Sequence, residues 1–309
     1  MADFEAPQAW RSGMCACGMK RGTFATQAGI RAACGAATTP GDTALCASLR
    51  ARATMGAMSQ SQVLILTHAP WERPGRILDA LDTCGIPYTS LSILKDAKPD
   101  LPDFDSIAGL VLMGGPMGAQ DFDQYPGLKV EAKLAKAAIV AGKPTLGVCL
   151  GHQIMATALG GKLKPGKAPE IGFGTITRLE NSHEFLPMWG KKATVLHWHN
   201  DCVTLPAGAT PLAKSDLTKV QAFRFGSGLG MQFHLEVGPA LFDEWMSEKE
   251  MTKDLKKSDV ARLREEYPQK DALIKPFAEA VFMGFAARCR SQVQAMAADE
   301  PKEEKIVIS

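Results

Sequence analysis

Long apolar runs are missing from this sequence of 309 residues. No stretch approaches the roughly 18 consecutive apolar residues that a membrane-spanning helix needs, so we expect no membrane partner. Basic and acidic side chains nearly cancel, at 35 against 33, and no basic stripe is present. Because a nucleic-acid-binding protein usually carries such a stripe, we expect no nucleic-acid partner either.

Paired cysteines are missing as well. The eight cysteines include no C-x-x-C pair of the kind that holds zinc, and they are scattered through a chain too long for a disulfide scaffold. Cys15-Ala-Cys17 has no nearby histidine to complete a metal site. We therefore expect no metal and no other cofactor.

Composition divides the chain into three zones. Residues 1–60 are rich in alanine, glycine and small polar residues without sustained periodicity, which predicts a disordered N-terminal extension without a catalytic role. Two origins stay open for it: an upstream start codon with Met58 as the functional start, or an appended or organellar targeting segment. Residues 61–240 form the expected main domain. Residues 241–309 are helical in character and are expected to pack on it as a C-terminal extension.

Strand and helix patterns alternate along the main domain. Val63-Leu-Ile-Leu66 predicts a strand, and the apolar spacing of Arg76 to Thr83 and of Leu128 to Val140 predicts amphipathic helices. The alternation predicts an α/β fold with a mostly parallel central sheet flanked by helices, and the strand-rich part after Gly161 predicts a small antiparallel addition. Further strands are expected over 88–94, 173–179, 193–198, 220–225 and 229–233 and at Leu110 and Leu146, with helices over 153–159, 241–251 and 272–287 and a charged solvated helix or cap over 252–270.

The segment Gly147-Val-Cys149-Leu-Gly151 has the G-x-nucleophile-x-G pattern. This pattern places a side chain on a sharp turn between a strand and a helix, because the two glycines let the backbone fold tightly. A thiol held there is poised for acyl transfer. The alternative interpretation is a buried cysteine beside a helix cap, since free cysteines are often small core residues.

A second motif, His234-Leu-Glu236, follows an apolar run near the end of the main domain. Positions two apart on a strand point to the same face, so the carboxylate of Glu236 would fix the tautomer and orientation of the His234 imidazole. On its own, such a pair is more often a surface pair. Together with Cys149 it supplies a nucleophile, a base and an orienting group.

A third motif is the glycine-rich turn Gly114-Gly115-Pro116, which follows the buried strand pattern ending at Met113. A thioester-forming cysteine needs N–H donors where the tetrahedral oxyanion develops. The N–H groups of Gly115 and Leu150 are the expected donors. The alternative is an ordinary strand-to-loop turn.

Five motifs follow one another in the sequence: Gly114-Gly115-Pro116, Gly147-Val-Cys149-Leu-Gly-His-Gln153, Glu170-Ile-Gly172-Phe-Gly174, His197-Trp-His-Asn-Asp201 and Gln232-Phe-His234-Leu-Glu236. In this order they resemble the class I (triad) glutamine amidotransferases, and most of all the stand-alone members similar to the glutaminase domain of GMP synthase. The resemblance covers about residues 62–240, which would be the amidotransferase catalytic domain. Leu235 stands where the GMP synthase domain usually has proline, and this favours the stand-alone branch.

The resemblance implies a flavodoxin-like fold and a cysteine-dependent enzyme that hydrolyses the γ-amide of glutamine to ammonia and glutamate. Cys149, His234 and Glu236 would be the catalytic residues. The substrate would contact Gly114, Gln153, His199, Asn200 and Asp201. Since the nucleophile must stay a thiol, we expect a cytoplasmic protein.

The acceptor of the ammonia is not in this chain. The sequence has no Ser-Gly-Gly-x-Asp-Ser pyrophosphatase loop and no P-loop, so the resemblance implies that an ammonia-accepting synthetase subunit is the partner. A second hypothesis is hydrolysis of γ-glutamyl peptides or conjugates, because the same triad cleaves any amide of the same acyl group. A third is a binding or regulatory module without turnover.

Overall fold

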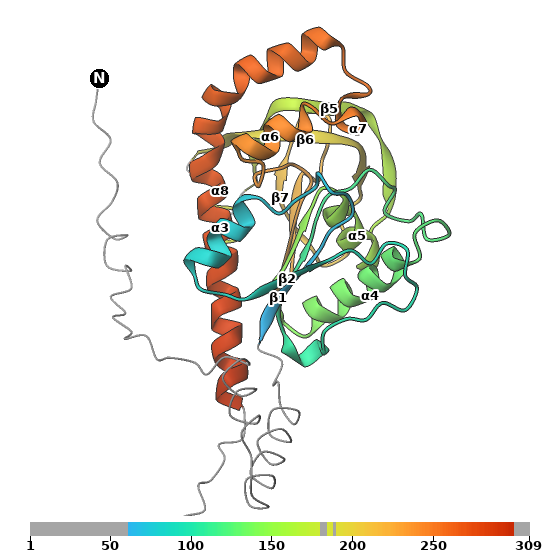
Figure 1. Cartoon of the computed structure of the whole chain (residues 1–309), viewed down its shortest axis with the longest axis vertical. Helices are drawn as coiled ribbons and strands as arrows, with labels where there is room; N and C mark the ends of the chain where they lie inside the picture. Colours follow the sequence, from blue (N-terminus) through green and yellow to red (C-terminus); the bar gives the residue numbers. More distant parts are fainter. Residues whose placement is uncertain (1–60, 180–183, 188–189, 300–309) are drawn as a thin grey trace, which may run out of the picture. The chain divides into compact units, whose positions relative to one another are not determined.

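The computed structural model describes residues 61–179, 184–187 and 190–299 of the chain. They belong to one unit that spans Ser59–Ser309 (Figure 1). The extension expected over residues 1–60 lies outside the described residues, and so does the end of the C-terminal tail.

The main sheet has nine strands within the described ranges, in the order β2-β1-β3-β4-β9-β8-β7-β5-β6. The first five run parallel, and the remaining pairings are antiparallel. This arrangement, with helices on both faces (Figure 1), confirms the predicted fold class. The parallel strands are β1 (Gln62–Leu66), β2 (Tyr88–Leu91), β3 (Ile107–Leu112), β4 (Thr145–Val148) and β9 (Gly228–Met231).

Alternation along the parallel strands divides the core between the two faces of the sheet. Val63 and Ile65 of β1 pack in one cluster with residues of α3 (Arg76–Thr83). Leu64 and Leu66 point to the other face and pack with residues of α4 (Gly127–Val140) and α5 (Leu150–Ala158). Both faces are covered, which explains why these strands read as continuous apolar runs.

The antiparallel part is larger than the sequence predicts. The expected strand over 173–179 is the end of a longer one, and a strand at Thr210–Lys214 is missing from the prediction because Pro211 and Pro206 indicate a loop. The expected strand over 229–233 ends at Met231, and it pairs in parallel with β4 and antiparallel with β8. The strands of this part are β5 (Leu163–Arg178), β6 (Lys192–Val203), β7 (Thr210–Lys214) and β8 (Ala222–Phe225).

The helix expected over 241–251 is two helices, α6 (Pro239–Trp245) and α7 (Lys249–Thr252). Glu248 between them has an extended backbone, and its carboxylate accepts a hydrogen bond from the N–H of Glu250 at 3.2 Å. A side chain that caps an N-terminus in this way starts a new helix.

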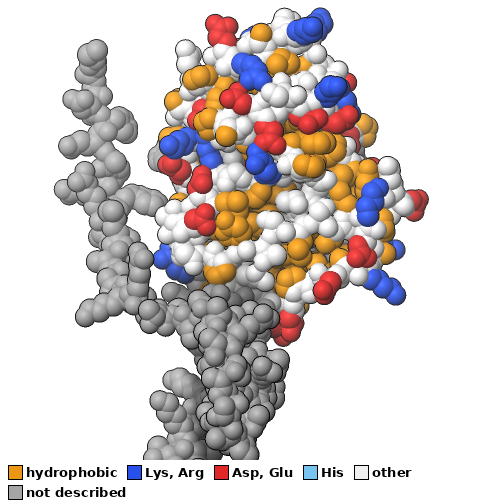
Figure 2. All heavy atoms as spheres, in the orientation of Figure 1, with side chains coloured by type: hydrophobic (Ala, Val, Ile, Leu, Met, Phe, Trp, Pro, Cys, Tyr) orange, Lys and Arg blue, Asp and Glu red, His pale blue; other side chains and the backbone are white. Residues whose placement is uncertain are grey.

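The last helix, α8 (Lys257–Asp299), includes most of the charged segment and the helix expected over 272–287. It contains Pro268 and Pro276, which remove backbone donors, and its ribbon bends sharply in Figure 1. It packs against α3 and against β3 and β6. None of the described helices combines the length and the apolar composition that crossing a membrane requires. Acidic and basic side chains are interspersed over the described part of the face in Figure 2.

Candidate active site

Cys149 lies on the turn between β4 and α5, as the glycine pattern predicts. It is the only non-glycine residue with positive φ in the described part of the chain, at 52°. It occupies the N-cap position of α5, so the thiol stands at the positive end of the helix dipole. A side chain held in such a strained backbone conformation is a common mark of a functional site.

The two flanking glycines are required by close approach. A Cβ on Gly151 would lie 2.1 Å from the carbonyl oxygen of Leu112, and one on Gly147 would lie 2.6 Å from that of Gly151. Both distances are too short for any side chain. The glycines therefore allow α5 to start directly against β3 and β4, which fixes the position of Cys149.

His234 and Glu236 form the expected pair, although not as neighbours on a strand. β9 ends at Met231, and His234 makes an isolated bridge with Leu196. The imidazole Nδ1 lies 2.7 Å from Glu236 Oε1, and Glu236 Oε2 accepts from the N–H of Leu235 at 3.0 Å. Both side chains are buried. The backbone contact turns the carboxylate back towards its own segment, which makes the pair possible outside a strand.

The surroundings of His234 favour its charged form. Burial lowers the pKa of this imidazole, but the Glu236 carboxylate and the nearby Cys149 thiol together raise it well above the ordinary value. The other ring nitrogen, Nε2, is buried, and no hydrogen bond of good geometry joins it to Cys149 or another described residue. Trp245 stands edge-on against the ring, with centroids 4.9 Å apart. The imidazole is thus fixed on one side and unpaired on the other.

The Gly114-Gly115 turn lies beside Cys149 and is held in place by a buried ion pair. His68 Nδ1 lies 3.0 Å from the Gly114 carbonyl oxygen, and its Nε2 lies 2.8 Å from Glu131 Oε2. Because both partners are acceptors, both ring nitrogens must carry protons. Burial lowers the pKa of His68, but Glu131 and Gly114 raise it overall. No local pattern in the sequence indicated a role for His68 or Glu131.

Glu72 is a buried acid that the sequence did not predict. Its Oε2 has no hydrogen-bond partner among the described residues, and a Cβ on Gly114 would lie 2.3 Å from it. Burial raises the pKa of Glu72 to about 7, with His234 and His68 opposing the shift and Glu236 adding to it. Glu72, His234 and Glu236 place ligand-type atoms within 4.8 Å of one another. His234 therefore lies near two carboxyl groups, those of Glu236 and Glu72.

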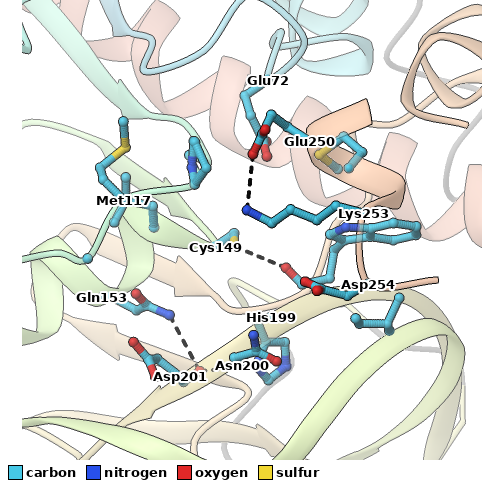
Figure 3. Close-up of a pocket in the computed structure, with 17 residues that line it drawn as sticks. Glu72, Met117, Cys149, Gln153, His199, Asn200, Asp201, Glu250, Lys253 and Asp254 are labelled. Carbon is cyan, nitrogen blue, oxygen red and sulfur yellow. Dashed lines mark hydrogen bonds and ion pairs between the residues drawn. The ribbon is translucent and has the colours of Figure 1, made fainter. Parts of the chain in front are cut away.

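A pocket of about 240 Å³ opens over Cys149 (Figure 3). Gln153 Nε2 donates to Gln232 Oε1 at 3.2 Å, and Gln232 Nε2 lies 3.7 Å from the Cys149 sulfur. Gln232 thus joins a predicted substrate contact to the thiol. Of the positions predicted to contact the substrate or the oxyanion, Gly114 does not line the pocket, and the others do: Gly115, Leu150, Gln153, His199, Asn200 and Asp201.

The far wall of the pocket comes from the C-terminal part of the chain. Glu250, Met251, Lys253 and Asp254 line it, and Lys253 extends to Glu250 at 3.0 Å (Figure 3). No sequence pattern indicated these contacts, because the charged composition of this segment is equally typical of a solvated surface.

A second group of potential metal ligands lies on the antiparallel strands. Glu170, His197 and His199 place ligand atoms within 4.8 Å of one another, where the sequence predicts no metal. Burial lowers the pKa of His199 and lowers that of His197 to about 4, although Glu170 opposes both shifts. The His197 imidazole is therefore neutral at physiological pH.

Comparison with known proteins agrees with this geometry. The family model described as "Glutamine amidotransferase class-I" matches residues 76–253, more than half of the chain. A putative glutamine amidotransferase-like protein, YfeJ of Salmonella typhimurium, is 30% identical over 183 residues, which cover 57% of this chain and 75% of that protein. A glutamine-hydrolyzing GMP synthase subunit of Ignicoccus hospitalis is 34% identical over 143 residues, or 45% of this chain and 70% of that one.

Solved structures show the same similarity. The crystal structure of a glutamine amidotransferase from Thermotoga maritima superposes with a TM-score of 0.67 at 27% identity, covering 74% of this chain and 98% of that one. The crystal structure of a glutamine amidotransferase from Methylobacillus flagellatus superposes with a TM-score of 0.62 at 25% identity, covering 75% of this chain and 95% of that one.

Proposed function

Because the chain belongs to the class I glutamine amidotransferase family, we propose that it hydrolyses the side-chain amide of glutamine through a thioester on Cys149. The observation that carries the proposal is the His234–Glu236 pair at 2.7 Å, which leaves the second ring nitrogen unpaired beside the strained Cys149 turn. The products are ammonia and glutamate.

In the first half-reaction His234 Nε2 takes the thiol proton, and the sulfur attacks the amide carbon of glutamine. The N–H groups of Leu150 and Gly115 stabilise the oxyanion; the former is free of intrahelical hydrogen bonds because it begins α5. Collapse of the tetrahedral intermediate breaks the C–N bond, and His234 returns its proton to the leaving ammonia. Glu236 stabilises the imidazolium between these two transfers.

In the second half-reaction water replaces ammonia. His234 takes a proton from the water as its oxygen attacks the glutamyl thioester, and the released thiolate is reprotonated when the intermediate collapses. Glutamate then leaves. The imidazole returns to its starting state, so each turnover consumes one glutamine and one water.

We assign the amino-acid end of glutamine to the polar wall of the pocket. Gln153, Asn200 and Asp201 supply amide and carboxylate groups. His199 supports this wall, since its Nδ1 lies 3.1 Å from the Asp201 carbonyl oxygen. Lys253 adds a positive charge that suits the substrate carboxylate.

Gly114 would act through the position of its turn, because it does not itself line the pocket. The absence of a Cβ at Gly114 lets the Glu72 carboxyl group pack directly against the turn. Its neighbour Gly115 is thereby held where its N–H can reach the oxyanion.

The ammonia would pass to a separate acceptor enzyme. The sequence has neither of the nucleotide-binding loops that an amination reaction would need, and the matched relatives include proteins named as glutamine-hydrolyzing subunits of GMP synthase. The partner class that we propose is therefore a synthetase subunit.

The test compares glutamine with a panel of γ-glutamyl peptides and conjugates, measuring ammonia, glutamate and free amine. The expected result is ammonia release from glutamine that is lost in Cys149→Ala. Faster release of amines from γ-glutamyl peptides, with little ammonia from glutamine, would show that γ-glutamyl compounds are the substrates. Silence on every substrate, together with no covalent labelling of Cys149, would favour a module without turnover.

A further inference from the structure

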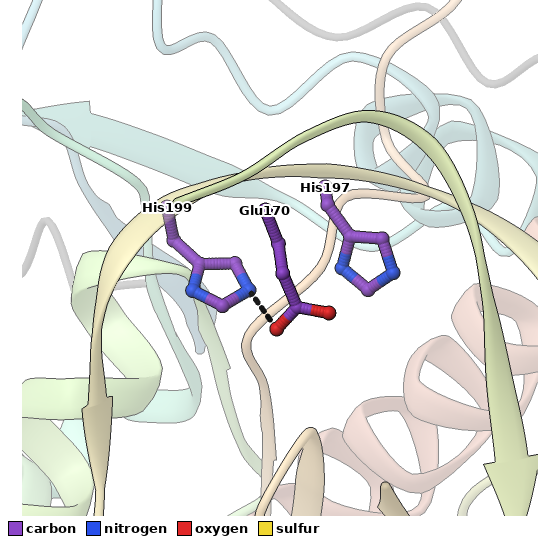
Figure 4. A group of neighbouring side chains, drawn as sticks. All are labelled: Glu170, His197 and His199. Atoms are coloured by element: carbon purple, nitrogen blue, oxygen red, sulfur yellow. Dashed lines mark ion pairs between the residues drawn. The ribbon is translucent and has the colours of Figure 1, made fainter. Parts of the chain in front are cut away.

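Glu170, His197 and His199 face one another across two antiparallel strands. Glu170 of β5 is paired in register with His199 of β6, and His197 lies two positions earlier on the same face. The Glu170 carboxylate lies between the two imidazole rings (Figure 4). Gly174 makes room for His197, because a Cβ there would lie 2.6 Å from the ring.

The contact between Glu170 and His199 joins two side chains of the kind that bind metal ions. His199 Nδ1 donates to the carbonyl oxygen of Asp201 at 3.1 Å. Its Nε2 faces Glu170 Oε2 at 3.4 Å. These two atoms are therefore close enough to bind one ion.

Two further polar atoms at this cluster are buried and without partners. His197 is 3% exposed, and its Nδ1 has no hydrogen-bond partner among the described residues. The fully buried Gln221 donates its Nε2 to Glu170 Oε2 at 2.9 Å and approaches His199 Nε2 at 3.4 Å, while its Oε1 has no partner there. The Gln221 amide nitrogen thus contacts both Glu170 and His199, as a cation bound between them would.

We propose that Glu170, His197 and His199 bind a divalent transition-metal ion, with Zn²⁺ as the best fit to two imidazoles and one carboxylate. Two ligands about 2.1 Å from a tetrahedral metal are about 3.4 Å apart, the separation found between Glu170 and His199. Rotation of the Gln221 amide by half a turn presents Oε1 as the fourth ligand. The hydrogen bond from His199 to the Asp201 carbonyl orients the ring as metal-bound histidines require.

The ion would join β5 to β6 next to the pocket. Trp198, His199, Asn200 and Asp201 all line the pocket and all belong to β6. A metal at His199 would hold this wall in place, separately from the chemistry at Cys149. The site is thus a structural or regulatory one, distinct from the proposed hydrolysis.

The test must separate this site from other zinc ligands, because Cys149, His234 and the cysteines of residues 1–58 also have side chains that bind zinc. We would therefore compare Cys149→Ala with Cys149→Ala/Glu170→Gln, both as full chains stripped with a chelator. Zn²⁺ is titrated by calorimetry, and Co²⁺ is followed by its visible ligand-field absorption. The expected result is that Cys149→Ala binds one Zn²⁺ per chain at this site. In Cys149→Ala/Glu170→Gln the same ion should bind at least about tenfold more weakly.

Zinc should also raise the thermal unfolding midpoint of Cys149→Ala by more than that of the double variant. If the double variant does not fold, Cys149→Ala/His197→Asn serves the same comparison. Equal stoichiometry and affinity in parent and ligand variants would overturn the proposal. So would a Co²⁺ spectrum that is identical in both proteins.

Discussion

The guanidinium of Arg76 in α3 is paired with the carboxylate of Asp271 in α8. The same guanidinium donates through Nη1 to the carbonyl oxygens of Leu235, at 3.2 Å, and Val237, at 3.1 Å. These residues flank Glu236, and Tyr267 of α8 donates to the Val237 carbonyl as well. The C-terminal helix therefore positions the segment that carries the proposed base.

Replacing Asp271 with asparagine should lower both stability and turnover. The change leaves the nearly buried Arg76 without a counter-charge, and breaking a buried pair by removing one partner costs about 3–5 kcal/mol. Because the pair supports the position of His234 and Glu236 and does not touch the pocket over Cys149, kcat should fall about tenfold with little change in KM. Chemical denaturation and steady-state kinetics measure the two effects.

The matched control is Arg262→Ala in the same helix. Arg262 pairs with Glu266 at 3.2 Å, but the Arg262 side chain is exposed and that of Glu266 is only half-buried. Its loss should change neither stability nor kcat appreciably. An Asp271→Asn variant that behaves like this control would show that α8 does not position the site.

Glu72→Gln should change the pH dependence of stability. The folded-state pKa of Glu72, raised by burial to about 7 from an ordinary 4.5, means that the folded protein holds a proton that the unfolded chain has lost. This contribution to stability is complete below pH 4.5 and disappears as pH rises through 7. Between these two pH values the free energy of unfolding of Glu72→Gln should therefore fall by about 3 kcal/mol less than that of the unsubstituted protein. Unfolding free energies of both proteins at pH 5 and pH 8 test the prediction, and parallel curves would contradict it.

Gly151→Ala should destabilise the protein by about 3 kcal/mol, because its Cβ would overlap the Leu112 carbonyl oxygen. Gly284→Ala in α8 is the matched control. A Cβ there meets its nearest neighbour, Arg288, at an ordinary 3.7 Å, and alanine in a helix stabilises by about 0.5–1 kcal/mol. Opposite signs for the two substitutions are expected in thermal unfolding. A neutral Gly151→Ala would mean that the turn at Cys149 has room for a side chain.

The sequence predicts the parts of the site that local patterns encode. The glycines around Cys149 and the spacing of His234 and Glu236 are short-range signals, and the strands that carry them are apolar enough to recognise. The family and the fold class follow from these motifs, and both predictions are confirmed. The assigned roles of the individual site residues remain predictions.

Local sequence patterns do not predict contacts between segments that are distant along the chain. Glu72 follows the first strand, but its role depends on burial against Gly114 and His234, which lie far away along the chain. Asp271 lies in a segment whose charged composition suggests solvent exposure. Glu170 and His199 meet only through the register of β5 and β6, which no local pattern fixes.

Glu236→Gln should reduce kcat about 100- to 10,000-fold and leave the fold intact. The amide keeps the shape of the side chain but no longer stabilises the charged imidazole of His234, whose pKa the carboxylate raises. The alkaline limb of the plot of rate against pH should therefore move to lower pH as kcat falls. Unchanged kinetics would show that another group orients the base.

The most direct test of the proposed mechanism is covalent labelling with a chloroketone analogue of glutamine, followed by peptide mass spectrometry. A thioester mechanism predicts one label per chain, on the peptide that contains Cys149. Excess glutamine should protect the thiol, and His234→Asn should slow its labelling. Labelling of other cysteines with Cys149 left free, or glutamine hydrolysis that survives in Cys149→Ala, would contradict a thioester at this residue.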